Sequence, residues 1–167
     1  MVNTAKPRFV ARTVDPQHVT ALQQEGISPG MARILAGRGI ETAESLVYDL
    51  RKAIPVSKLT NAEKMAKHLA DKIQAGHKFL LVADYDSDGA TSCAIGIRAM
   101  RAFGANIEFM VPNRFVHGYG LTPEIIQEVI AKGEKPDCIL TVDNGVASVA
   151  GVAEANKNGI KVLVTDH

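Results

Sequence analysis

Phe79-Leu80-Leu81-Val82-Ala83 is followed at once by Asp84-Tyr85-Asp86-Ser87-Asp88-Gly89, and the two together determine the architecture. Five apolar residues in a row are typical of a strand that is buried on both faces of a parallel sheet. The three carboxylates that follow would repel one another, and one of them would take up a proton, unless cations lie among their oxygens. The sequence therefore predicts a buried strand that ends in a site for hard divalent metal ions.

Apolar runs alternate with helical patterns from residue 60 to the end of the sequence. We expect strands at residues 79–83, 106–111, 138–142 and 162–165. Helices are expected at residues 60–75, 89–103, 122–132 and 148–158, the first of them opened by a capping box from Thr60 to Glu63. Strands that alternate with helices form parallel sheets with both faces covered. This pattern predicts an α/β fold, a three-layer α/β/α domain with a mainly parallel sheet.

Residues 1–59 have a different character. Short helical patterns at residues 17–24, 31–36 and 42–49 are interrupted by glycine and proline, and Pro55 forces an extended passage before the next element. We therefore expect a small helical N-terminal segment at residues 1–59, followed by the α/β domain at residues 60–167.

Composition limits the class of protein. With 46% hydrophobic residues the chain can bury a core, and it has no apolar run near the ~20 residues that cross a bilayer. The N-terminal residues 1–6 lack the apolar centre of a secretory signal. Cys93 and Cys138 have no metal-binding spacing, so we expect small buried side chains in a reducing compartment. These features predict a cytoplasmic protein that makes no membrane contact. The other histidines, His18, His68, His77 and His117, have no ligand partners in sequence and are expected on the surface.

Charge is divided unevenly along the chain. Residues 1–83 hold 12 Lys and Arg against 7 Asp and Glu, whereas residues 84–167 hold 7 against 11. An acidic half suits a metal site, and a basic half could contact a polyanion. Ordinary solvated helix faces would give the same basic counts, so both interpretations of the basic half stay open.

Further polar residues follow the third and fourth expected strands. Asp143 comes directly after residues 138–142, and Asp166 and His167 come directly after residues 162–165. Because the carboxyl ends of parallel strands share one edge of a sheet, we expect these side chains to meet the carboxylates of the first strand. Asp-Asn-Gly after a strand is also common turn chemistry, so Asp143 alone would indicate little. The three carboxylates after the first strand are harder to explain in that way, since a turn needs only one.

The chemistry of these residues favours two bound metal ions. The alternation from Asp84 to Gly89 also matches the start of an EF-hand calcium loop. That loop needs a helix in front and an acid at its twelfth position, where this chain has Ile95. Mixed carboxylate and imidazole ligands suit Mn²⁺, with Mg²⁺ a weaker candidate. Two such ions, with Asp143 as the candidate bridge, form an arrangement that hydrolyses phosphoesters.

Four motifs together resemble the DHH phosphoesterases, and within them the exonucleases that are specific for single-stranded DNA. The motifs are Asp84-Tyr85-Asp86-Ser87-Asp88-Gly89-Ala90-Thr91, Val111-Pro112-Asn113-Arg114-Phe115 with Gly118-Tyr119-Gly120-Leu121, Thr141-Val142-Asp143-Asn144-Gly145, and Val164-Thr165-Asp166-His167. The first motif marks only the superfamily, whereas the second points to the exonucleases. The resemblance runs from about residue 55 to the last residue.

The resemblance implies a 5′-to-3′ exonuclease that depends on Mn²⁺ or Mg²⁺ and hydrolyses single-stranded DNA in repair and recombination. By the same resemblance, its partners would include a single-strand-binding protein and a helicase. The implied metal ligands are Asp84, Asp86, Asp88, Asp143 and His167, of which all but Asp84 would be catalytic. The residues implied to contact substrate are Asn113, Arg114 and Tyr119. Arg114 would lie beside a phosphate. Tyr119 would either stack on a base or pack under its own glycine-rich loop. Asp166 would orient its neighbours.

The chain departs from the family pattern at its last residue, because the Asp-His-His motif stops at its first histidine. The resemblance implies a second histidine, a further metal-binding Asp, a substrate domain and an oligonucleotide-binding fold, so we expect a longer parent protein. The chain alone is expected to bind metal weakly and to show little or no nuclease activity. Other interpretations stay open: a DHH phosphodiesterase for oligonucleotides or cyclic dinucleotides, a pyrophosphatase, and a non-catalytic fragment that binds DNA or a partner.

Overall fold

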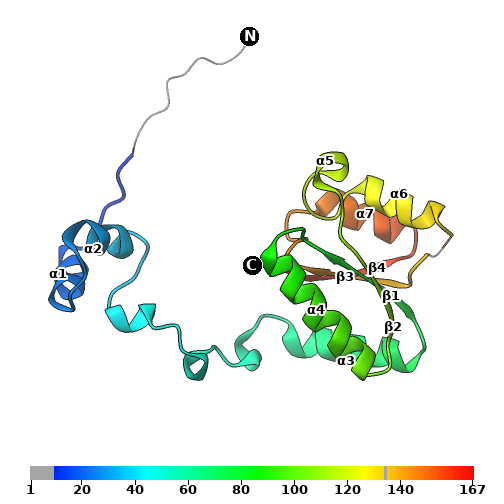
Figure 1. Cartoon of the computed structure of the whole chain (residues 1–167), viewed down its shortest axis with the longest axis horizontal. Helices are drawn as coiled ribbons and strands as arrows, with labels where there is room; N and C mark the ends of the chain where they lie inside the picture. The colour runs from blue at the N-terminus through cyan, green and yellow to red at the C-terminus, as the bar shows by residue number, and fades with distance from the viewer. Residues whose placement is uncertain (1–9, 134) are drawn as a thin grey trace, which may run out of the picture. The chain divides into compact units, whose positions relative to one another are not determined.

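A computed structural model of the protein describes residues 10–133 and 135–167, so residues 1–9 of the expected N-terminal segment lie outside the described residues. The described residues form two compact units, which divide between Pro55 and Val56 (Figure 1). The expected domain boundary after residue 59 stays a prediction.

The N-terminal unit is built on two short helices, α1 (Pro16–Gln24) and α2 (Pro29–Ala36). Both helices begin with proline, whose fixed φ suits the first helical position, and the Asp15 carboxylate caps α1 by accepting a hydrogen bond from the Gln17 N–H. The two helices pack around the buried residues Leu22, Ala32 and Ala36. These contacts explain why such short helices are stable in this unit.

Short 3₁₀ turns follow α2: η1 (Ala43–Leu46) and η2 (Leu50–Lys52). The helix expected at residues 42–49 is therefore wrong, because only η1 forms there. No residue of η1 is buried, and Tyr48 is fully exposed. A helix of this length needs a packed face, and this segment has none.

The second unit is the expected three-layer α/β/α domain. Its elements in chain order are η3 (Val56–Lys58), α3 (Ala62–Gln74), β1 (Lys78–Ala83), α4 (Ser87–Ala102), β2 (Asn106–Met110), α5 (Arg114–His117), α6 (Pro123–Ala131), β3 (Cys138–Val142), α7 (Val149–Lys157) and β4 (Lys161–Thr165). The four strands pair in parallel in the order β2-β1-β3-β4. The fold class predicted from the sequence is thus confirmed.

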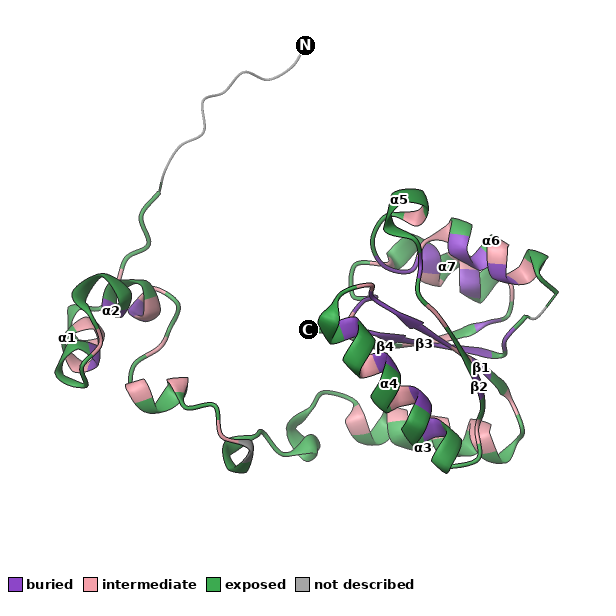
Figure 2. Cartoon of the chain, in the orientation of Figure 1, coloured by how far each residue is buried: buried purple, intermediate pink, exposed green. Residues whose placement is uncertain are grey.

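Two hydrophobic clusters cover the two faces of this sheet. On one face, Leu81 and Leu140 pack against α4, with the partly buried residues of α3 beside them. On the other face, Val82 and Ile139 pack against α6 and α7. Both cysteines are buried, as expected. The central strands β1 and β3 are accordingly the most buried part of the domain (Figure 2).

Two local features differ from the sequence-based expectation. The capping box from Thr60 to Glu63 does not form, because α3 begins at Ala62 and its N-cap is Asn61, in the left-handed region at φ 61° without a side-chain cap bond. The Ala62 N–H donates to the Leu59 carbonyl, so the chain turns tightly just before the helix, and Asn tolerates that backbone conformation. The short helix α5 was not expected; Asn113 caps it by accepting from the Phe115 N–H.

In the described part of the chain, no helix is both long enough and apolar enough to span a membrane.

The close approach of α7 to the chain entering α6 gives a test of the packing. A Cβ at Gly151 in α7 would overlap the backbone carbonyl of Leu121, which cannot rotate away as a side chain could. We expect Gly151→Ala to lower the free energy of unfolding by about 1–3 kcal/mol, measured by thermal and denaturant unfolding. Gly30→Ala in α2 is the control, because a Cβ there would meet open space. An unchanged stability of Gly151→Ala would contradict this packing.

Candidate metal centre

The strand register places polar residues side by side at one edge of the sheet. Ala83 of β1 pairs with Val142 of β3, and Val142 pairs with Thr165 of β4. The next residue on each strand is an aspartate, so Asp84, Asp143 and Asp166 leave the sheet together. Backbone bonds continue the ladder one step further: the Asp84 N–H donates to the Val142 carbonyl and the Asp143 N–H to the Thr165 carbonyl.

Three carboxylates form the centre of this edge, and we call Asp84, Asp86 and Asp143 the acidic cluster. One oxygen of each lies within 4.8 Å of an oxygen of the others. Asp84 is buried, Asp143 is half-buried and Asp86 is exposed. Three like charges at this separation repel strongly in a partly desolvated site, and divalent cations would relieve that repulsion.

Asp86 serves the fold as well as the cluster. Its Oδ1 accepts hydrogen bonds from the N–H groups of Asp88 and Gly89, at 3.1 and 3.0 Å, and so caps α4. Because both bonds go to Oδ1, Oδ2 can bind a cation. A Cβ on Gly89 would overlap the backbone of Asp84, so glycine is required here for the first turn of α4 to approach the end of β1.

Asp143 is held in an uncommon backbone conformation, at φ 60° in the left-handed region. Its backbone carbonyl accepts a hydrogen bond from the Tyr119 hydroxyl at 3.2 Å. Desolvation, followed by the negative charge of Asp86, raises the pKa of the Asp143 carboxyl, while His167 opposes the shift. His167 Nε2 lies 3.4 Å from Asp143 Oδ1, although the imidazole is largely exposed.

The remaining predicted ligand and its neighbour lie at the margin of the cluster. Asp88 is exposed in the first turn of α4, outside the three residues that meet within 4.8 Å, although its charge also raises the pKa of Asp143. Asp166 accepts from the N–H groups of Val146 and His167, at 2.9 Å each, and so fixes the loop after β3 against the end of β4. The metal-binding roles of Asp88 and His167 stay predictions.

The predicted substrate residues come from α5 and the loop that follows it. Arg114 places its guanidinium over the ring of Tyr85, 4.6 Å from the centroid, and Tyr85 stands between Asp84 and Asp86 in the chain. Asn113 Oδ1 is engaged in capping α5. Desolvation and the charge of Asp166 raise the pKa of Tyr119, whose hydroxyl already binds the Asp143 carbonyl. Tyr119 thus contacts the acidic cluster through Asp143, and Arg114 contacts the residue between Asp84 and Asp86 in the chain. Their contacts with substrate stay predictions.

Sequence reasoning missed the role of Asn144. Its side chain is buried, and its amide donates to the Val82 carbonyl at 3.1 Å and to the Val142 carbonyl at 2.9 Å. These two bonds tie β1 to β3 just before Asp84 and Asp143 leave the sheet. The Asp-Asn-Gly motif was the available signal, but it indicated only a turn.

The four histidines expected on the surface are each only partly exposed. His117 is the clearest case, since its Nε2 lies 2.9 Å from the Glu128 carboxylate and its side chain is 11% exposed. The pair links the end of α5 to α6. The contact could not be predicted from the sequence because the two residues lie in separate elements.

The donor set fits a hard divalent ion. The acidic cluster supplies three carboxylates from two strand ends, and His167 adds an imidazole beside Asp143. Oxygen ligands suit Mg²⁺ and Mn²⁺ alike, and the imidazole shifts the preference toward Mn²⁺.

Comparisons with known proteins agree with this geometry. The model of the DHH family, N-terminal domain, matches residues 78–167. The single-stranded-DNA-specific exonuclease RecJ of Escherichia coli (strain K12) is 42% identical over 142 residues, which are 84% of this chain and 24% of that protein. The chain therefore spans about a quarter of the length of this relative.

Solved structures show the same similarity. A crystal structure of exonuclease RecJ bound to manganese matches with a TM-score of 0.61 and 33% identity, over 69% of this chain and 29% of that one. The structure of RecJ from Thermus thermophilus in complex with Mn²⁺ matches with a TM-score of 0.58 and 28% identity, over 90% of this chain and 20% of that one.

Removing one charge from the acidic cluster should have two opposite effects. Without divalent ions, Asp143→Asn should raise the melting temperature by about 2–4 °C, because it removes like-charge repulsion and Asn tolerates the left-handed backbone. With saturating Mn²⁺, it should lose most of the stabilisation that the metal gives the unsubstituted chain. Thermal unfolding in EDTA and in Mn²⁺ measures both. Equal stabilisation of both proteins by Mn²⁺ would remove Asp143 from the ligand set.

Asn144→Ala should loosen the junction between β1 and β3. Loss of its two buried bonds should cost about 1–3 kcal/mol in the free energy of unfolding and weaken Mn²⁺ binding, because Asp84 and Asp143 are then less well aligned. Calorimetric titration with Mn²⁺ and denaturant unfolding provide the two readouts. Asn158→Ala is the matched control, since that amide bonds only to Glu154 within one helical turn. Metal affinity that is lost equally in both variants would contradict this positioning role.

Proposed function

The chain belongs to the DHH family, and on that premise we propose that it supplies the metal-binding part of an exonuclease that hydrolyses single-stranded DNA in the 5′-to-3′ direction. The observation that carries the proposal is the acidic cluster, in which Asp84, Asp86 and Asp143 meet within 4.8 Å at the carboxyl edge of a parallel sheet. The similarity to RecJ exonucleases supports the nature of the substrate.

Each residue has a distinct part in this proposal. Asp84 and Asp86 at the end of β1 and Asp143 at the end of β3 would hold the ions, and Asp88 and His167 would complete the ligand set. When bound, two divalent ions activate a water and stabilise negative charge on the phosphate oxygens. Asp86 Oδ1 keeps α4 in place, which would leave Oδ2 for an ion. Asp166 holds the loop that carries Asp143 and needs no contact with metal.

Arg114 is suited to position a phosphate beside the cluster. Its planar guanidinium matches two phosphate oxygens at once, and stacking on Tyr85 orients it before substrate arrives. Orientation of this kind lowers the entropy lost on binding. We assign Arg114 to the phosphate next to the scissile bond, and Asn113 to holding α5, on which Arg114 is carried.

Exposed aromatic side chains next to Arg114 favour a single strand. Phe115 is 92% exposed and Tyr119 is 56% exposed. Unpaired bases stack on exposed rings with about 1–3 kcal/mol each, whereas bases inside a duplex are already stacked on one another. This surface therefore supports single-stranded DNA over duplex DNA as the substrate.

The cellular setting is part of the same proposal and rests on family resemblance. We place the reaction in the cytoplasm, in DNA repair and recombination. A single-strand-binding protein and a helicase would supply the single strand.

A chimera tests the proposal directly. Residues 10–167 replace the aligned segment of Escherichia coli RecJ, and the product is assayed on 5′-phosphorylated single-stranded DNA with Mn²⁺. We expect degradation of the single strand from its 5′ end, and a loss of at least about 100-fold in rate for Asp86→Asn or Asp143→Asn. Asp71→Asn, an exposed acid on α3, is the control and should keep full activity. An active Asp86→Asn chimera, or one that prefers duplex DNA or cyclic dinucleotides, would overturn the proposal.

A further inference from the structure

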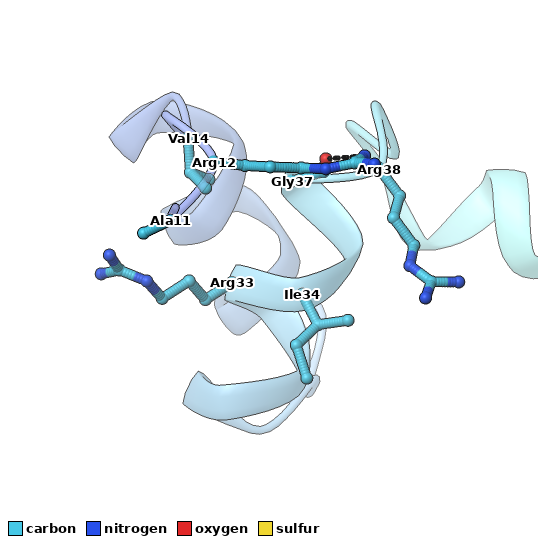
Figure 3. Close-up of a pocket in the computed structure, with 7 residues that line it drawn as sticks. All are labelled: Ala11, Arg12, Val14, Arg33, Ile34, Gly37 and Arg38. Atoms are coloured by element: carbon cyan, nitrogen blue, oxygen red, sulfur yellow. Dashed lines mark hydrogen bonds between the residues drawn. The ribbon is translucent and has the colours of Figure 1, made fainter. Parts of the chain in front are cut away.

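The N-terminal unit contains a basic hollow that the metal centre does not use. Its volume is about 580 Å³. The residues that line it are Ala11, Arg12, Val14, Arg33, Ile34, Gly37 and Arg38 (Figure 3). Three of these are arginines and none of the seven is acidic. We call this surface the arginine hollow.

The arginines of the hollow have no carboxylate partner within the described residues of the unit. The other basic residues there are paired: Arg51 with Asp49 at 2.6 Å, and Lys52 with Glu44 at 2.9 Å. The remaining acids are occupied elsewhere, Asp15 as the cap of α1, Glu25 as acceptor from the Ala43 N–H, and Glu41 beside His18. The positive charge of the hollow is therefore locally uncompensated, which favours an anionic ligand.

The shape of the hollow favours an extended anion. Arg12 lies along the end of α2, where its Nη1 donates to the Gly37 carbonyl at 3.1 Å. The side chains of Arg33 and Arg38 extend to opposite sides, with Ile34 between them (Figure 3). Ile34 is exposed and offers an apolar contact. Positive charges that are spread in this way match successive phosphates along a chain better than they match one compact anion. The apolar side chain of Ile34 would then lie against the sugars.

We propose that the arginine hollow binds the phosphodiester backbone of a single-stranded nucleic acid, through residues that are not part of the metal centre. Arginine suits this ligand because its planar fork can donate two hydrogen bonds to one phosphate. The inference does not depend on catalysis at the acidic cluster. It gives the N-terminal unit a nucleic-acid-binding function of its own.

The test measures binding without metal, so that the metal centre contributes little. The full chain is titrated in EDTA against a fluorescent oligo(dT) of about 30 nucleotides, longer than one binding site, at several salt concentrations. The double variant Arg33→Gln/Arg38→Gln removes two exposed charges and leaves the Arg12 bond to Gly37 intact. We expect the Kd to rise about tenfold and the slope of log K against log salt to fall by about 1.4, or ~0.7 for each lost phosphate contact.

Two further variants decide between a specific site and general charge. Arg51→Gln/Lys52→Gln removes the same net charge from paired residues of the same unit and should bind as the unsubstituted chain does. Arg33→Lys/Arg38→Lys should restore the salt slope but only part of the affinity, because lysine lacks the planar guanidinium that donates two hydrogen bonds to one phosphate. Equal weakening by both Gln variants would overturn the proposal. It would also be overturned if a poly-glutamate peptide of equal charge displaced the oligonucleotide as well as unlabelled oligo(dT) does, since that would indicate an acidic protein ligand.

The outcome is independent of the proposed nuclease. The nuclease proposal is tested by hydrolysis in the chimera with Mn²⁺, whereas the arginine hollow is tested by binding in EDTA, where no metal-dependent hydrolysis takes place. Loss of binding in Arg33→Gln/Arg38→Gln would support the arginine hollow even if no hydrolysis were found.

Discussion

Repulsion among Asp84, Asp86 and Asp143 is the constraint on which the rest of this domain depends. The chain holds these like charges together with the most buried part of the domain, two parallel strands paired in one register. A slip of the register between β1 and β3 would separate Asp84 from Asp143. The hydrophobic clusters on both faces prevent that slip, so the packing of the sheet is also what aligns the metal ligands.

Much of this arrangement could be predicted because it rests on local patterns. The apolar runs at β1 and β3 identified the strands, and the rule that parallel strands end at one edge predicted that Asp84 and Asp143 meet. The alternation of strands and helices likewise predicted the three layers, because it is typical of a parallel sheet with both faces covered. Both features depend on residues that are close in sequence or on a general rule of topology.

Contacts between distant side chains could not be predicted in this way. The stacking of Arg114 on Tyr85, the bonds from Asn144 to two strands and the pair of His117 with Glu128 each join separate elements. For these three contacts the deciding information lies in how the elements meet, which no single segment carries. The start of α3 was mispredicted for a different reason, because a local turn with Asn61 in the left-handed region replaces the capping box at Thr60.

The cap that Asp86 provides to α4 has a consequence for assembly. The N–H groups at the start of this sixteen-residue helix carry a partial positive charge, and they point at one of the three carboxylates. The helix therefore acts as a permanent counter-charge that is part of the polypeptide itself. Part of the repulsion among the three carboxylates is therefore offset within the polypeptide itself, which lowers the cost of folding the domain without a bound ion.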